Sequence, residues 1–178
     1  IEAYEAVVDQ VDFESIEVRE RALRHDVKAR IEEFCDLAGH EHIHRGMTSR
    51  DLTDNVEQLQ IRMSMQLVRE RLVAVLYKIA ASATELMLQP VAGRSHNVAA
   101  QVTTVGKRLA SFGEEALMAF ERIDQLIAGY PLSGIKGPMG TSQDQLDLFS
   151  GDIDNLAALE SLIADHLGFS VLLGSVGQ

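Results

Sequence analysis

The sequence contains little cysteine, proline or aromatic residue, and these shortages exclude several classes of protein. Its 178 residues include one cysteine, three prolines and no tryptophan, and aromatic residues make up 5%. The single Cys35 excludes an internal disulfide framework and fits a reducing, cytoplasmic compartment. No apolar run approaches the ~20 residues that span a bilayer, so we expect no membrane partner.

Basic residues are also scarce. There are 16 Lys and Arg against 27 Asp and Glu, which gives a formal net charge of −11. This balance argues against a nucleic-acid partner, because such surfaces need clustered positive charge. It leaves room for a small anionic substrate, since a few local cations can outweigh the overall charge.

The residues that are abundant favour an all-α fold built from very long helices. Hydrophobic residues make up 46% of the chain, and few prolines interrupt its helix formers. Thr48 and Asp51 form a helix-start pattern, and neither Pro nor Gly follows until Pro90, so we expect a helix of roughly 38 residues, about 57 Å long. Before it we expect one or two short helices in 2–24 and a helix in 25–38 that ends at Gly39. After a break at 89–97 we expect a second long helix, with Val102 among its apolar positions and a stop at Gly129. A glycine-rich loop at 133–142 and a helix near 153–167 complete the expected elements.

The long helix at 51–89 has two apolar stripes instead of one. One stripe contains Leu52, Val56 and Leu59, and the other contains Ile61 and Met65. A helix that is apolar on two faces is enclosed by neighbours on both sides. In a chain this short, we expect some of these neighbours to come from other subunits of a helical bundle.

Three of the six histidines lie in the stretch HEHIHRGMTSRD, residues 40–51. A metal site, a run of surface residues and one edge of an active site are the possible interpretations. His40, His42 and His44 are spaced two apart, which is unlike the usual ligand spacing for tetrahedral zinc, and no Cys or second His cluster lies nearby. We therefore expect no metal, and a solvated loop with one useful histidine.

Two further histidines have positions suited to proton transfer. His96 lies in GRSH, in the connection between the longest helices, where it could act as a general acid or base, or equally as a capping or surface residue. His25 is followed by Asp26, a neighbour that can fix the tautomer of an imidazole, although such pairs are common by chance.

The segment GIKGPMGT could wrap backbone N–H groups around an anion with help from Lys136, or could simply be a tight turn. It matches neither of the common phosphate-binding patterns, which favours the turn. No G-x-S-x-G elbow surrounds Ser49 or Ser95, so a hydrolase triad has little support.

Four segments in order resemble one known family. RHDV at 24–27, HRGMTSRD at 44–51, GRSHNVAAQVTT at 93–104 and GPMGT at 137–141 are similar to motifs of the adenylosuccinate lyases, which belong to the fumarase/aspartase superfamily. The resemblance implies β-elimination of fumarate from adenylosuccinate, giving AMP, and from a related imidazole-carboxamide succinate nucleotide in purine biosynthesis. It implies no cofactor.

The same resemblance assigns roles to individual residues. It implies that His96 is the general acid for the departing nitrogen and that His44 is a second active-site histidine that orients the substrate. The implied substrate-binding residues are Arg24, His25 and Asp26 for the nucleotide, Thr48, Ser49 and Ser95 as hydroxyl donors to the succinyl carboxylate, and Gln178. His40 and His42 match nothing in the family pattern, and we interpret them as surface residues.

The chain departs from the family pattern in two ways. Asn97, Ala99, Gln101 and Val102 replace family residues, so a second histidine of that loop is missing. The signature loop S-S-x-M-P-x-K-x-N-P, which carries the serine thought to act as the base, is absent from these 178 residues. We therefore expect a fragment that is incomplete at both ends and inactive alone.

The resemblance also implies an organisation. Residues 1–50 would be part of an N-terminal helical domain, and residues 51–178 the first part of the central long-helix bundle. The parent enzyme would be a homotetramer whose active sites are shared between subunits. Two alternatives stay open: another fumarate-releasing lyase of the superfamily, or a helical scaffold module without catalytic function.

Overall fold

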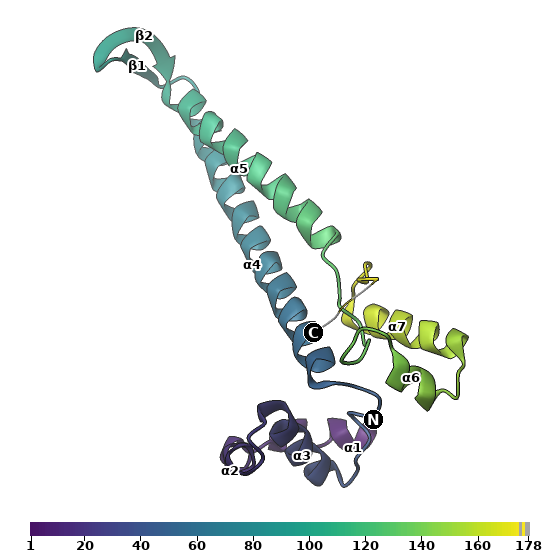
Figure 1. The fold of residues 1–178 in the computed structure, drawn as a ribbon. Coiled ribbons are helices and arrows are strands. Elements are labelled where there is room, and N and C mark those ends of the chain that lie inside the picture. Colours follow the sequence, from purple (N-terminus) through teal and green to yellow (C-terminus); the bar gives the residue numbers. More distant parts are fainter. Residues whose placement is uncertain (175, 177–178) are drawn as a thin grey trace. The chain divides into compact units, whose positions relative to one another are not determined.

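The structure is a computed structural model, and it describes residues 1–174 and 176 (Figure 1). Long α-helices dominate it, as the all-α prediction requires. Its elements are α1 (Glu2–Glu5), the 3-10 helix η1 (Val8–Gln10), α2 (Phe13–Leu23), α3 (Asp26–Ala38), α4 (Ser49–Glu85), β1 (Pro90–Ser95), β2 (Val98–Thr104), α5 (Val105–Ala128), α6 (Gln143–Leu148) and α7 (Ile153–Leu167). None of the helices described is long and apolar enough to cross a membrane.

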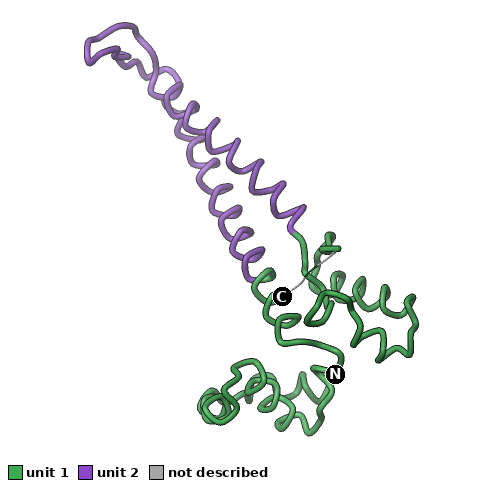
Figure 2. The backbone as a smooth tube through the Cα atoms, in the orientation of Figure 1, with its two compact units in different colours: residues 1–59, 131–178 green, residues 60–130 purple. Residues whose placement is uncertain are grey.

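The chain divides into two compact units (Figure 2). Unit 1 contains residues 1–59 and 131–178, and unit 2 contains residues 60–130. These units are defined by packing within this chain. The domain boundary expected after residue 50 stays a prediction.

The helices of unit 1 begin and end at the residues that the sequence marks for this purpose. The side chain of Asp12 caps α2, and the side chain of Asp152 caps α7. Gly39 and Gly168 follow α3 and α7 with φ of 69° and 71°, the left-handed backbone that glycine adopts without strain. The predicted helices at 25–38 and 153–167 are thereby confirmed.

The core of unit 1 combines small apolar residues with one buried acid. Ile16 of α2 and Val27 and Ala29 of α3 are buried where these two helices pack together. Glu33 is also buried, and it accepts hydrogen bonds from the Ser15 hydroxyl and the Arg19 guanidinium. A buried acid with several donors is satisfied, so this part of the unit needs no ligand to complete it.

Leu132 forms a second buried centre of unit 1. Its N–H donates to the Val171 carbonyl at 2.9 Å, and its carbonyl accepts from the Leu173 N–H at 2.9 Å. These bonds attach the start of the 133–142 loop to the segment that follows α7, and so give that loop one fixed end.

Helix α4 begins where the sequence predicts. The Thr48 N–H donates to the Asp51 carboxylate at 2.9 Å, which is the backward-reaching bond of a capping box. The helix continues for 37 residues to Glu85, slightly short of the expected end. A long helix at this position is confirmed.

The region after α4 differs from the expectation. Residues 90–104 form an antiparallel hairpin of β1 and β2, so Val102 belongs to a strand and the second long helix begins only at Val105. The stretch is rich in Val and Thr, which favour extended backbone. The spacing of three between Val102 and Val105 fits a helix as well, but the β-branched residues of this stretch pair across the hairpin.

Within unit 2, α5 returns antiparallel to α4 from the end that carries the hairpin (Figure 1). Gly106 allows this approach, since a Cβ there would lie 2.4 Å from the Ala83 carbonyl oxygen and 2.6 Å from Met87 Cα. Further along, Arg69 forms an ion pair with Asp124. The helix pair still leaves many large apolar side chains exposed: Ile61, Met63, Leu67, Val68, Val73, Val75, Phe112, Leu117, Met118 and Leu126.

Candidate functional site

The RHD motif forms the turn between α2 and α3. Arg24 ends α2 in the left-handed conformation with φ of 53°, His25 is the N-cap of α3, and Asp26 is its first residue. The three residues line a wide, open hollow with a volume of about 830 Å³, together with Glu17, Glu20 and Arg21. The same open space is therefore bordered by two guanidinium groups, from Arg21 of α2 and Arg24 of the turn, by the His25 imidazole and by carboxylates.

The cap geometry of His25 determines which of its nitrogens carries the proton when the ring is neutral. Its Nδ1 accepts from the Lys28 N–H at 3.3 Å, so the hydrogen of the neutral ring is on Nε2. Nε2 lies 3.2 Å from Ser49 Oγ, to which it can donate. The N-terminus of α3 and the first residue of α4 are therefore joined by two residues that the sequence marked as candidates.

His25, His44 and Ser49 line one cleft of about 490 Å³. The cleft is also lined by two cationic side chains, Lys28 and Arg45, and by three acidic ones, Glu32, Asp36 and Glu41. His44 borders a second cavity of about 470 Å³, whose other walls are mostly apolar. The structure thus brings three of the predicted site residues together, and Thr48 precedes Ser49 directly.

His44 has an unusual environment for a histidine. Its Nε2 is shielded from solvent and finds no hydrogen-bond partner in the part of the chain that the structure describes. A buried polar atom without a partner is costly in a folded protein and is often found at a functional site. His44 therefore stands apart from His40 and His42.

His40 and His42 are exposed, as expected for surface residues. Their rings stack on each other with centroids 5.8 Å apart. The Tyr4 hydroxyl fixes this loop, because it donates to the His40 carbonyl at 2.6 Å and accepts from the His42 N–H at 2.9 Å. Among the residues described, no group of three metal-ligating side chains is found.

Ser95 and His96 lie in unit 2, in the hairpin. Both are exposed, and His96 and Asn97 form the two-residue turn between the strands with φ of 50° and 64°. Positive φ at both central residues is the mark of a type I′ turn. The catalytic role of His96 and the binding role of Ser95 stay predictions, and Gln178 lies outside the described residues.

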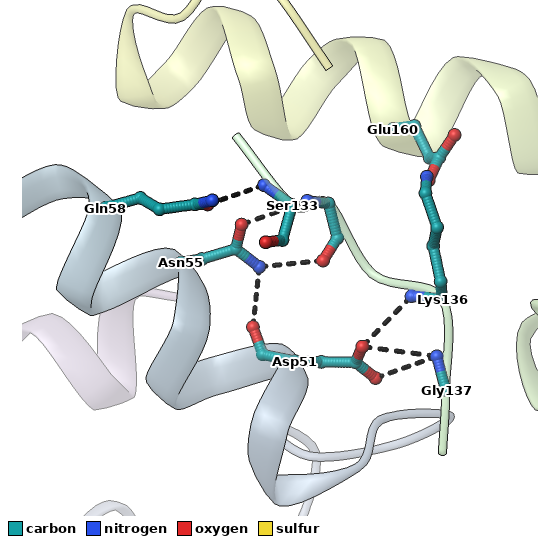
Figure 3. A network of polar contacts seen from close by, with 8 residues as sticks. Asp51, Asn55, Gln58, Ser133, Lys136, Gly137 and Glu160 are labelled. Carbon is teal, nitrogen blue, oxygen red and sulfur yellow. Dashed lines mark hydrogen bonds and ion pairs between the residues drawn. The ribbon is translucent and has the colours of Figure 1, made fainter. Parts of the chain in front are cut away.

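Sequence reasoning missed a set of polar side chains on α4, which we call the polar clasp: Asp51, Asn55 and Gln58 (Figure 3). All three project from one face of the helix towards the loop that begins at Ser133. Gln58 Oε1 accepts from the Ser133 N–H at 2.6 Å. Asn55 accepts from the Gly134 N–H at 3.0 Å and donates to the Gly134 carbonyl at 2.8 Å.

The third member of the clasp, Asp51, is buried and binds the same loop further along. Its carboxylate accepts from the Lys136 N–H at 3.0 Å and from the Gly137 N–H at 3.1 Å. The loop does wrap backbone N–H groups around an anion, and that anion is Asp51 of the same chain. Lys136 is buried and paired with Glu160 of α7, so the expected anion cradle for a ligand is not what this part of the loop forms.

The spacing of the clasp residues was a signal that could have revealed it. Positions 51, 55 and 58 share one helix face beside the apolar stripe of Leu52, Val56 and Leu59, and all three are polar. A row of carboxylate and amide groups next to an apolar stripe can bind the backbone of a segment that packs there, but it does not say which segment this is.

A family model described as lyase matches residues 1–145. The chain is 34% identical over 162 residues to the adenylosuccinate lyase of Saccharomyces cerevisiae, an alignment that covers 90% of this chain and 34% of that protein. It is 33% identical over 173 residues to the adenylosuccinate lyase of Caenorhabditis briggsae, covering 96% of this chain and 36% of that protein. The chain thus spans about a third of the length of these curated relatives.

Solved structures with the same fold have lower sequence identity. The β-carboxy-cis,cis-muconate cycloisomerase of Acinetobacter calcoaceticus aligns with a TM-score of 0.80 at 17% identity, over 98% of this chain and 40% of that one. A fumarate lyase from Mesorhizobium aligns with a TM-score of 0.76 at 21% identity, over 96% of this chain and 40% of that one. These likenesses support the predicted helical-bundle fold class.

Proposed function

Because this chain belongs to the lyase family whose model matches residues 1–145, we propose that it is part of an adenylosuccinate lyase. The full enzyme would split adenylosuccinate into AMP and fumarate, and would cleave the related imidazole-carboxamide succinate nucleotide in the same way. Both reactions serve purine biosynthesis. The relatives from yeast and Caenorhabditis briggsae carry the name of this enzyme and align with nearly the whole chain.

The observation that carries the proposal is the cleft shared by His25, His44 and Ser49. Lys28 and Arg45 line it together with the acids Glu32, Asp36 and Glu41, and Lys28 is paired with Glu32, so the groups left to bind an anion are Arg45, the Ser49 hydroxyl and the two imidazoles. Carboxylate and phosphate groups of a succinyl nucleotide need such local cations and hydroxyl donors. A helical scaffold module has no need for them.

The chemistry requires two proton movements. A base removes the proton from the succinyl carbon beside a carboxylate, the electrons form the double bond of fumarate, and the carbon–nitrogen bond breaks. The departing nitrogen must then be protonated, which we assign to His96 as general acid. His44, whose Nε2 has no hydrogen-bond partner among the described residues, orients the substrate.

Binding would be divided between hydroxyl donors and the RHD turn. Thr48, Ser49 and Ser95 would donate to the succinyl carboxylate. Arg24, His25 and Asp26 would contact the nucleotide, because they line the same open hollow. Gln178 completes the proposed set of substrate contacts, and no cofactor takes part in the proposal.

We also propose that the full enzyme is a homotetramer with active sites shared between subunits. The support is the number of large apolar side chains that α4 and α5 leave exposed within unit 2, such as Leu67 and Phe112. Faces of this kind are buried in helical bundles. The free, buried Cys35 is compatible with the cytoplasmic location that we propose.

Ligand-dependent stability of the full-length protein tests the function. AMP with fumarate should raise the melting temperature, since a ligand that binds only the folded state stabilises it. Ser49→Ala should reduce this shift, and Ser64→Ala, which changes an exposed serine of unit 2, should leave it unchanged. Absence of any shift at millimolar AMP would favour another fumarate-releasing lyase.

Turnover gives the second test. The full-length protein should convert adenylosuccinate to AMP and fumarate, which is followed by ultraviolet absorbance. A protein of residues 1–178 alone should not, because it lacks the signature loop. Turnover by this shorter protein would contradict the proposed role of the missing loop.

A further inference from the structure

Besides His25, which lies within hydrogen-bond distance of Ser49, two buried side chains of unit 1 bind the segment that holds His44, Thr48 and Ser49. In one attachment, Gln145 of α6 donates from its side chain to the Gly46 carbonyl. In the other, Asp51 accepts from the Thr48 N–H at 2.9 Å. Gln145 and Asp51 are both at least nine-tenths buried, so water competes little for these bonds.

Both attachments lead to the same element, the loop that follows Leu132. The Asp51 carboxylate that binds Thr48 also binds the N–H groups of Lys136 and Gly137. The Ser142 N–H donates to the Lys136 carbonyl at 2.8 Å, and Ser142 leads directly into α6 with Gln145. The loop and α6 therefore form one support that reaches the site segment from both sides.

This support is itself anchored. Lys136 is paired with Glu160 of α7, and Asn55 forms two hydrogen bonds with the backbone of Gly134. A loop held by buried backbone bonds at several residues has few alternative conformations. It can therefore fix the position of any group that is bonded to it.

We propose that Asp51 and Gln145 are positioning residues for the hydroxyl pair Thr48 and Ser49. This inference rests on the proposed function, in which those hydroxyls bind the succinyl carboxylate. Asp51 holds the backbone immediately before Ser49, and Ser49 Oγ lies 3.2 Å from His25 Nε2. Small displacements of such groups reduce the rate of a reaction strongly, even when every group that contacts the substrate is still present.

Asp51→Asn is the most informative substitution. It keeps the size of the side chain but replaces one carboxylate oxygen with an NH₂ group, which cannot accept from an N–H. At least one of the bonds to Thr48, Lys136 and Gly137 must then be lost. The matched control is Asp54→Asn, the same change one turn along α4 at a residue that pairs with Arg50 and, among the residues that the structure describes, has no hydrogen bond to the loop.

Hydrogen exchange of the full-length protein, followed by mass spectrometry, tests the attachment. In Asp51→Asn, at least one of the amides of Thr48, Lys136 and Gly137 should exchange at least tenfold faster, and in Asp54→Asn all three should exchange at the wild-type rate. Unchanged exchange in Asp51→Asn would overturn the inference. This measurement does not depend on turnover, so it remains decisive if the proposed lyase activity is wrong.

A double-mutant cycle tests the positioning role in the full-length enzyme. Asp51→Asn should lower kcat/KM for adenylosuccinate at least tenfold, and Asp54→Asn less than twofold. If Asp51 acts through Ser49, it should have little further effect in a Ser49→Ala background, because the group that it positions is gone. Independent, multiplying effects would show that Asp51 only stabilises the fold and would overturn the inference. Absence of turnover in the wild-type protein would instead refute the proposed function.

Discussion

Replacing Asn55 with alanine tests how strongly the polar clasp contributes to the stability of unit 1. Asn55 is buried, and its side chain forms two bonds with the Gly134 backbone, at 2.8 Å and 3.0 Å. Its third bond, to the Asp51 carbonyl at 2.6 Å, lies within the helix. Alanine is a better helix former than asparagine, so any loss of stability must come from the loop.

The expected loss can be worked out from the groups left behind. Gly134 is buried, so in Asn55→Ala its N–H and its carbonyl both lose a partner without access to bulk water. Each unsatisfied buried group costs about 1–3 kcal/mol. We therefore expect the free energy of unfolding to fall by about 2–6 kcal/mol, which is large for a single substitution.

Urea denaturation followed by circular dichroism measures this change. The control is Asn155→Ala, which removes an exposed hydrogen bond of 2.8 Å to Asp152 and should cost less than about 0.5 kcal/mol. Hydrogen exchange at Gly134 should accelerate in Asn55→Ala and stay unchanged in Asn155→Ala. Equal effects of the two substitutions on unfolding would show that the clasp bonds contribute no net stability.

Three further substitutions test other parts of the structure. Gly106→Ala should destabilise the α4–α5 pair by about 1–3 kcal/mol, because the new Cβ would meet backbone atoms of residues 83 and 87, and the melting temperature should fall. Gly113→Ala is the control and should be nearly neutral, because its new Cβ would meet only a side-chain methyl group, at 3.1 Å. Tyr4→Phe should cost about 1–2 kcal/mol and speed amide exchange at His42, and unchanged exchange there would exclude Tyr4 as the anchor of the loop. Leu67→Glu should reduce the oligomer size of the full-length enzyme in sedimentation; an unchanged tetramer would place the interface elsewhere.

The helices of this protein were predictable because their ends carry local signals. The pattern from Thr48 to Asp51 gave the start of α4, and the glycines at 39 and 168 gave the ends of α3 and α7. Such signals act within one turn of helix, so they can be recognised without knowing the rest of the fold. The candidate residues His25, His44 and Ser49 were found in the same way, from short motifs.

The hairpin and the polar clasp were not predictable on the same basis. The apolar residues of the hairpin are spaced in a way that also fits a helix. The hairpin turn depends on His96 and Asn97 adopting positive φ. The clasp joins Asp51 to Lys136, 85 residues away in the sequence. A single sequence shows that Asp51 can accept hydrogen bonds, but only the folded chain shows which donors reach it.

The clasp binds main-chain atoms of the loop and no side-chain atoms of it, and this has a consequence for protein engineering. Ile135, which is only partly buried, can be exchanged for other residues without removing a clasp bond, whereas Ser133 is buried and Gly134 and Gly137, with φ of 77° and 73°, must keep their left-handed backbone. A sequence library at position 135 should therefore retain the fold in most members. The loop is a natural place to introduce a reporter group close to the proposed active site, while α4 keeps its conformation unchanged.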